Sequence, residues 1–153
     1  MPCTGRKGKA AIGSRDRMRT LIVAAGVIIE QEKVLVTQRM ENSPHGLLWE
    51  FPGGKLKEGE EPREALRREL KEELGFEAEV GRIIEPVFHL FPDPLLLLTY
   101  QCYREKGRLE RLGCRDFRWV DLGELAGLAM PPADGPVRHH LSVFAEDYGM
   151  TRR

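Results

Sequence analysis

Apolar and polar positions along the chain predict five strands and three helices. Apolar residues that alternate or run together between turn residues are typical of strands, and apolar residues spaced three and four apart are typical of helices. The strands are expected at 21–29, 34–39, 77–90, 95–103 and 117–120, and the helices at 62–74, 121–128 (a short helix or turn) and about 134–148. The first two strands read as an antiparallel pair across a polar turn. Strands interleaved with helices favour an α+β fold built on a mixed sheet.

The expected helix 62–74 carries an acidic arc beside its buried stripe. The stripe consists of Leu66, Leu70 and Leu74. Glu69, Glu72 and Glu73 stand at i, i+3 and i+4, so they project from neighbouring points on one face. Glu73 lies nearest the stripe and is expected to be partly desolvated. Like charges at this spacing repel, and a hard divalent cation such as Mg²⁺ or Mn²⁺ would offset that repulsion.

A charged surface helix is the alternative interpretation of this segment, since Arg67, Arg68 and Lys71 can form ion pairs with the acids. The flanking residues favour the interpretation of this segment as a metal site. The run 49–55 reads Trp-Glu-Phe-Pro-Gly-Gly-Lys, and its glycines let a backbone carbonyl approach a metal or phosphate without an intervening side chain. Glu60 and Pro62 then mark the start of the helix.

Together these residues resemble the Nudix box, with every specified position filled. The pattern is Gly54-x5-Glu60-x7-Arg68-Glu69-Leu70-x-Glu72-Glu73-x-Gly75-Phe76. The run 49–55 is similar to the MutT branch of that family, and a weaker resemblance extends from about Leu21 to Leu141. The resemblance implies a single domain over 20–150, in which a mixed sheet is sandwiched between helices (an α/β/α sandwich). A basic tail over 1–19 precedes this domain.

The resemblance also implies the chemistry of the phosphate end. Glu69, Glu72 and Glu73 are the expected metal ligands, together with the carbonyl of Gly53. Mg²⁺ is the expected cofactor, and Mn²⁺ is expected to substitute for it. Glu69 is a candidate general base, and Arg68 completes the candidate catalytic set by orienting a carboxylate through a bidentate hydrogen bond. Gly54 and Glu60 are expected to support the site.

Base recognition in the family implies three further positions, Arg39, Phe51 and Asp134. Each also has an ordinary structural interpretation. Arg39 could be an exposed residue at a strand end, Phe51 could be core packing, and Asp134 could be a helix N-cap. His45, in the loop on the substrate side, could contact phosphate, although a lone loop histidine is more often solvated.

Two positions depart from the family pattern. Members specific for oxidised guanine carry Asn where this chain has Asp134, and an ionised Asp can only accept hydrogen bonds. That difference leaves open a preference for dCTP, CTP or modified pyrimidine nucleotides. Many relatives also carry a metal-binding Glu six residues before the tryptophan that matches Trp119. Gly113 occupies that position here, and Glu110 could replace the carboxylate only if the loop shifts.

Charge and cysteine content narrow the classes of partner and compartment. Residues 1–19 hold six basic residues and one acid (+5), and the other 18 basic and 23 acidic residues give −5. A mildly acidic body argues against a dedicated nucleic-acid surface, so we expect a nucleoside triphosphate as substrate and no stable nucleic-acid partner. No apolar run is long enough to span a membrane. The three cysteines show no CxxC, which fits reduced thiols in the cytoplasm, and Cys102 is expected in the core.

The favoured function is Mg²⁺-dependent hydrolysis of nucleoside triphosphates to a monophosphate and pyrophosphate, as in nucleotide-pool sanitation of the 8-oxo-dGTP diphosphatase type. One alternative keeps the chemistry but changes the substrate to CTP, dCTP or a modified pyrimidine nucleotide. Nucleoside diphosphate sugars and dinucleotide polyphosphates are disfavoured, because the additional signatures of those branches are not evident. The alternative from another class is a non-catalytic Nudix-like nucleotide-binding module. The sequence does not indicate an oligomeric state.

Overall fold

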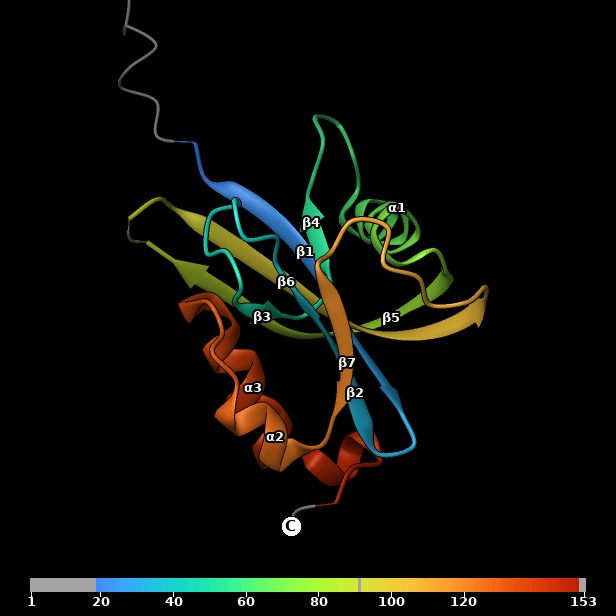
Figure 1. Cartoon of the computed structure of the whole chain (residues 1–153). Coiled ribbons are helices and arrows are strands. Elements are labelled where there is room, and N and C mark those ends of the chain that lie inside the picture. The colour runs from blue at the N-terminus through green and yellow to red at the C-terminus, as the bar shows by residue number, and fades with distance from the viewer. Residues whose placement is uncertain (1–18, 91, 152–153) are drawn as a thin grey trace, which may run out of the picture.

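The computed structural model describes residues 19–90 and 92–151 (Figure 1). Its elements, in chain order, are β1 (Leu21–Glu30), β2 (Lys33–Gln38), β3 (Trp49–Glu50), β4 (Gly53–Lys55), α1 (Pro62–Leu74), β5 (Glu77–His89), β6 (Leu95–Lys106), β7 (Asp116–Val120), α2 (Leu122–Gly127), a 3-10 turn η1 (Pro132–Asp134), α3 (Gly135–Val143) and a second 3-10 turn η2 (Ala145–Tyr148). The five expected strands are present, and the run 49–55 adds two short ones. The expected tail over 1–19 lies almost wholly outside the described residues.

The strands form one mixed sheet with the order β3-β2-β1-β6-β5, in which β4 pairs with β1 and β7 pairs with β2. Strands β1 and β6 are parallel, and the other pairs are antiparallel. The first two strands therefore pair as expected. Because β3 and β4 attach to β2 and β1 respectively, the short turn between them spans the point where the sheet divides.

Helices cover both faces of this sheet, so the predicted α/β/α sandwich is confirmed. In Figure 1, α1 lies on one side of the strands, and α2 and α3 lie on the other. Each side has its own apolar cluster. The cluster under α1 contains Leu66, Leu70, Leu74, Phe76 and the predicted core residue Cys102, each 0–1% exposed. The cluster under α3 is centred on Val27, Val36, Val137 and Leu141.

Helix α1 begins and ends where the sequence places it. Pro62 occupies its first turn, and the side chain of Glu61 accepts hydrogen bonds from the backbone N–H groups of Arg63 and Glu64. Gly75 ends the helix at a φ of 78°, a left-handed conformation that glycine adopts without strain. These caps therefore fix both ends of the helix that carries the acidic face.

The prediction of a single helix over 134–148 is wrong, because the structure divides this segment into two helical pieces. Helix α3 stops at Val143, Phe144 leaves helical geometry (φ −106°, ψ 30°), and η2 follows. Helical spacing predicts that Phe144 shares one face with Val137 and Leu141, but Phe144 is 46% exposed, and Ala145 and Tyr148 are buried instead. A hydrogen bond of 2.9 Å between His140 Nε2 and the Tyr148 hydroxyl accompanies this rotation of the buried face.

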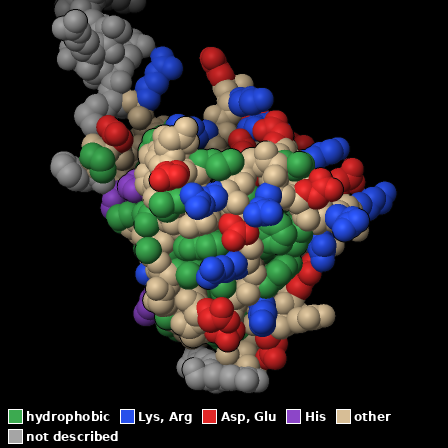
Figure 2. Space-filling model, viewed as in Figure 1, with side chains coloured by type: hydrophobic (Ala, Val, Ile, Leu, Met, Phe, Trp, Pro, Cys, Tyr) green, Lys and Arg blue, Asp and Glu red, His purple; other side chains and the backbone are tan. Residues whose placement is uncertain are grey.

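No helix formed by the described residues is both long enough and apolar enough to cross a membrane. On the face shown in Figure 2, Lys and Arg side chains alternate with Asp and Glu, and no continuous basic stripe appears there.

Candidate active site

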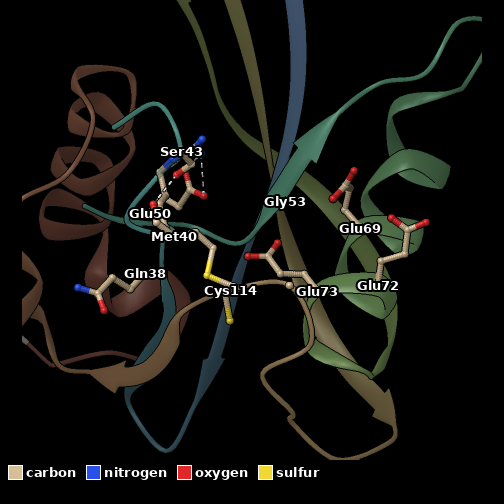
Figure 3. A pocket seen from close by; sticks show the side chains of 11 residues that line it. Gln38, Met40, Ser43, Glu50, Gly53, Glu69, Glu72, Glu73 and Cys114 are labelled. Carbon is tan, nitrogen blue, oxygen red and sulfur yellow. Dashed lines mark hydrogen bonds and ion pairs between the residues drawn. The ribbon is translucent and has the colours of Figure 1, made fainter. Parts of the chain in front are cut away.

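The acidic face of α1 lines a cavity of about 300 Å³ that opens between the helix and the loop after β2. The lining residues are Gln38, Arg39, Met40, Ser43, Glu50, Gly53, Glu69, Glu72, Glu73, Gly113 and Cys114. Figure 3 shows Glu69, Glu72 and Glu73 projecting from α1 on one side, with Glu50 opposite and Gly53 between them. All four expected metal ligands therefore line one cavity, which we call the acidic pocket.

Arg68 binds three of the neighbouring carboxylates. Its Nε and Nη2 donate to both oxygens of Glu60 at 2.8 Å, so the expected bidentate hydrogen bond is present. Its Nη1 donates to Glu69 at 2.8 Å and to Glu72 at 3.1 Å. Hydrogen bonds from Arg68 and from the backbone N–H of Lys57 lower the pKa of Glu60 to about 2. Glu60 thus stays ionised and fixes the guanidinium that in turn holds Glu69 and Glu72.

Glu73 is placed differently from the other acids. It forms no ion pair with any residue that the structure describes. Burial, reinforced by the charges of Glu50 and Glu69, raises the pKa of Glu73 to about 8. The expected desolvation of Glu73 is confirmed, and at neutral pH its carboxyl carries a proton in the metal-free protein.

The donor set of the acidic pocket fits a hard divalent cation. Three helix carboxylates and a backbone carbonyl are all oxygen donors, which Mg²⁺ and Mn²⁺ prefer. Among the described residues no three acidic, His or Cys side chains already converge on one point. The ion pairs with Arg68 account for this, because they turn Glu69 and Glu72 toward the guanidinium. Binding a cation would require both carboxylates to share or exchange that partner.

Glycine is required where β4 meets α1. A Cβ on Gly54 would stand 2.4 Å from the carboxyl carbon of Glu69, and a Cβ on Gly53 would stand 2.0 Å from the carbonyl oxygen of Ala24. No side chain fits at either position without movement of backbone or of Glu69. The two glycines therefore allow β4 to pack against β1 while Glu69 lies directly over the turn.

A second, more apolar cavity of about 420 Å³ adjoins the acidic pocket, and we call it the apolar pocket. All three positions expected to recognise the base, Arg39, Phe51 and Asp134, line it. The other walls come from β1, β6 and the turn before α3, with Leu21, Val23, Ala25, Leu95, Leu97, Pro131, Pro132 and Ala133 among the lining residues. Arg39, Glu50 and Gly53 line both pockets, so the two cavities share a wall.

Arg39 and Asp134 are not in their ordinary structural roles. Arg39 forms an ion pair of 3.0 Å with Glu50 and donates a hydrogen bond of 2.6 Å to the carbonyl of Pro44. Asp134 is 6% exposed, and its side chain makes no capping hydrogen bond to α3. Phe51 is 2% exposed and belongs to the apolar cluster under α3, so the core-packing interpretation is confirmed. It also lines the pocket, and its role in base recognition stays a prediction.

The contrast between Asp134 and the Asn of relatives assumes an ionised carboxylate, and the burial of Asp134 opposes ionisation. Burial, reinforced by the charge of Glu50, raises the pKa of Asp134 to about 8. Below that pH the carboxyl is neutral, with one donor and one acceptor like the amide of Asn. The main chemical contrast drawn from the sequence between this chain and the Asn-bearing relatives therefore disappears at neutral pH.

Comparison with known proteins decides the family. A family model described as the NUDIX domain matches residues 20–141. The chain belongs to the Nudix family. It is therefore a hydrolase, as the sequence indicated, and its α1 with the preceding glycine turn is the Nudix helix.

The proteins to which the chain is similar include 8-oxo-dGTP diphosphatases and a CTP pyrophosphohydrolase. An 8-oxo-dGTP diphosphatase of Proteus vulgaris is 42% identical over 54% of this chain and 74% of that protein. A CTP pyrophosphohydrolase of Escherichia coli is 46% identical over 44% of this chain and 50% of that protein. The solution structure of the E. coli ORF135 protein aligns with a TM-score of 0.71 and 30% identity, over 85% of this chain and 94% of that one.

The residue in place of the expected glutamate, Gly113, lies directly against the Nudix helix. Its N–H donates a hydrogen bond of 3.0 Å to the carbonyl of Glu73, and a Cβ there would stand 3.3 Å from the Glu73 Cα. Glu110 does not line the acidic pocket but lies near Gly75 at the end of α1. The loop shift that would let Glu110 replace the carboxylate is therefore not seen.

Glu50 is the residue that sequence reasoning missed. It lines both pockets, pairs with Arg39, and burial raises its pKa. The available signal was its position, because this carboxylate stands between two large aromatic residues, Trp49 and Phe51, immediately before the glycine turn. His45 lines the apolar pocket as expected for the substrate side, and His89, left unassigned from sequence, joins it.

Glu73→Gln should change how stability depends on pH. The folded pKa of about 8 lies above the ordinary 4.5, so the metal-free protein loses stability as pH rises from about 4.5 to about 8. Glutamine stays neutral, so the unfolding free energy of the variant minus that of the wild type should increase over this range, by on the order of a few kcal/mol. Urea unfolding in EDTA at pH 5, 6.5 and 8 measures it.

Glu58→Gln is the matched control, since Glu58 is an exposed acid ahead of α1. Parallel pH curves for the wild type and Glu73→Gln, each like that of the control, would contradict the burial of an unpaired Glu73.

Mg²⁺ should raise the melting temperature of the wild type and of Glu58→Gln more than that of Glu73→Gln.

Proposed function

We propose that this Nudix hydrolase cleaves nucleoside triphosphates to a monophosphate and pyrophosphate with Mg²⁺, in the manner of an 8-oxo-dGTP diphosphatase. The observation that carries the proposal is the shared wall between the two pockets. An acidic pocket suited to a metal and phosphates adjoins an apolar pocket of about 420 Å³, which suits a nucleoside. A substrate lying across Arg39, Glu50 and Gly53 would place its base and its phosphates in chemically matched surroundings.

A divalent cation, when bound, supplies positive charge at the phosphates, and Nudix hydrolases generally need one. Glu69, Glu72, Glu73 and the Gly53 carbonyl are the proposed ligands. Glu69 is the proposed general base, since Arg68 holds its carboxylate at 2.8 Å and thereby fixes its orientation. Glu60, bound to the same guanidinium, keeps Arg68 in place when the cation competes for Glu69 and Glu72.

A preference for cytosine nucleotides is the second candidate, because one similar protein is a CTP pyrophosphohydrolase. Two carboxyl groups, Glu50 and Asp134, line the apolar pocket and could accept hydrogen bonds from an exocyclic amine. The raised pKa of Asp134 favours the first candidate, because a neutral carboxyl can also donate to the O6 acceptor of a guanine. We place the enzyme in the cytoplasm, where its substrates occur, and propose no stable nucleic-acid partner.

A nucleotide panel tests the proposal. With Mg²⁺, we expect pyrophosphate release from 8-oxo-dGTP, and kcat/KM relative to dCTP and CTP identifies the base preference. Glu69→Gln, Glu72→Gln and Glu73→Gln should each lower kcat by at least about 100-fold, since each removes a proposed ligand or base. Glu58→Gln should keep the wild-type rate.

Release of pyrophosphate from none of the triphosphates would refute the proposed reaction and favour a non-catalytic binding module, or a diphosphate-sugar or dinucleotide substrate if those were cleaved instead. Wild-type rates in the three glutamine variants would refute the proposed metal ligands.

Asp134→Asn tests the protonation state of the base-recognition site. Asn offers a donor and an acceptor at every pH, whereas Asp134 loses its donor as pH rises through about 8. The ratio of wild-type to variant kcat/KM for 8-oxo-dGTP should therefore fall about tenfold between pH 7 and pH 9. Both proteins share the metal site, so the pH dependence of the metal site cancels in the ratio. A constant ratio would show that Asp134 does not donate to the base.

A further inference from the structure

The hydroxyl of Thr37 is buried and has no hydrogen-bond partner in the described part of the chain. Thr37 is 0% exposed, and only one other described side chain, Thr99, has a buried polar atom without a partner. Burying a hydroxyl without a partner is unfavourable, so such a group calls for an explanation. Valine has nearly the same shape and already fills two positions of β2, so β2 itself does not need the hydroxyl.

Thr37 lies beside the acidic pocket. The next two residues along the chain, Gln38 at the end of β2 and Arg39 after it, line that pocket. Thr37 is paired across the sheet with Glu50 on β3 and with Phe117 on β7. Its hydroxyl is close enough to Glu73 to oppose the rise in the pKa of that carboxyl, although the two form no hydrogen bond of normal geometry. Glu73 is therefore the acceptor within reach of this donor.

Thr99 offers a contrast within the same sheet. It is also 0% exposed and has no partner among the described residues, but it lies on β6 opposite Ala25, whereas Thr37 lies opposite the pocket residue Glu50. The two threonines share their chemistry and burial and differ in their distance from the acids. Thr99 is consequently a matched control for any effect of removing a buried hydroxyl.

We propose that Thr37 is a positioning residue for Glu73: its hydroxyl donates a hydrogen bond to one oxygen of the ionised Glu73 carboxylate and directs the other oxygen toward the divalent cation. This inference rests on the metal site of the proposed function. It assigns a function to a buried hydroxyl that has no partner among the described residues, which is to orient a proposed metal ligand. A residue that holds a metal ligand in this way typically affects metal affinity by about tenfold or more.

Mn²⁺ titration of the full chain without nucleotide, followed by the EPR signal of the free ion, tests the inference. We expect Thr37→Val to weaken Mn²⁺ binding about tenfold, Thr37→Ser to stay within about threefold of the wild type, and Thr99→Val to bind like the wild type. In EDTA, Thr37→Val and Thr99→Val should be at least as stable as the wild type, since each loses an unpartnered hydroxyl. Thr37→Ala must give the same loss of affinity should the valine variant misfold.

The outcomes separate this inference from the function on which it rests. Wild-type affinity in Thr37→Val, or equal weakening in Thr99→Val, overturns the role of Thr37 while leaving the metal site intact, provided that Glu73→Gln still weakens binding. Failure of the wild type to bind Mn²⁺ overturns both proposals.

Discussion

Glu73 is an acid buried beside other acids, and the described residues provide it with no cation. Arg68 contacts Glu60, Glu69 and Glu72, and its single positive charge offsets part of the charge of these three acids. It does not reach Glu73, whose pKa rises to about 8 as a result of burial and neighbouring charge. In the metal-free protein a proton relieves that charge. In the proposed metal site a divalent cation replaces this proton. The Glu73 carboxyl is then neutral without the metal and ionised when the metal is bound.

The rest of the fold holds this carboxyl where it is. The apolar stripe of α1 packs into the cluster beneath it, and the loop before β7 donates backbone hydrogen bonds to the carbonyl of Glu73. The turn through Gly53 and Gly54 brings β4 against both β1 and Glu69. Arg39 and Glu50 extend this surface into the apolar pocket, so the proposed phosphate and base sites are coupled through one ion pair.

Local sequence was enough to predict what depends on local spacing. The bounds of α1, the shared acidic face and the desolvation of Glu73 follow from helical periodicity and from caps within a single segment. Phe144 was assigned to the wrong face because α3 stops early and Tyr148 bonds to His140, which is a tertiary contact. Glu50 was missed and Asp134 was taken as ionised for one reason: the burial of both carboxyls, and the effect of the Glu50 charge on Asp134, arise only in the folded pocket that both residues line.

We expect a divalent cation that binds in the acidic pocket to displace a proton from Glu73. Calorimetric titration with Mn²⁺ at pH 7, in several buffers of different ionisation enthalpy, measures the number of protons released per ion bound. We expect close to one proton for the wild type and close to none for Glu73→Gln, because only the wild type carries a titratable carboxyl there. Binding of Mn²⁺ to the wild type without proton release would contradict it.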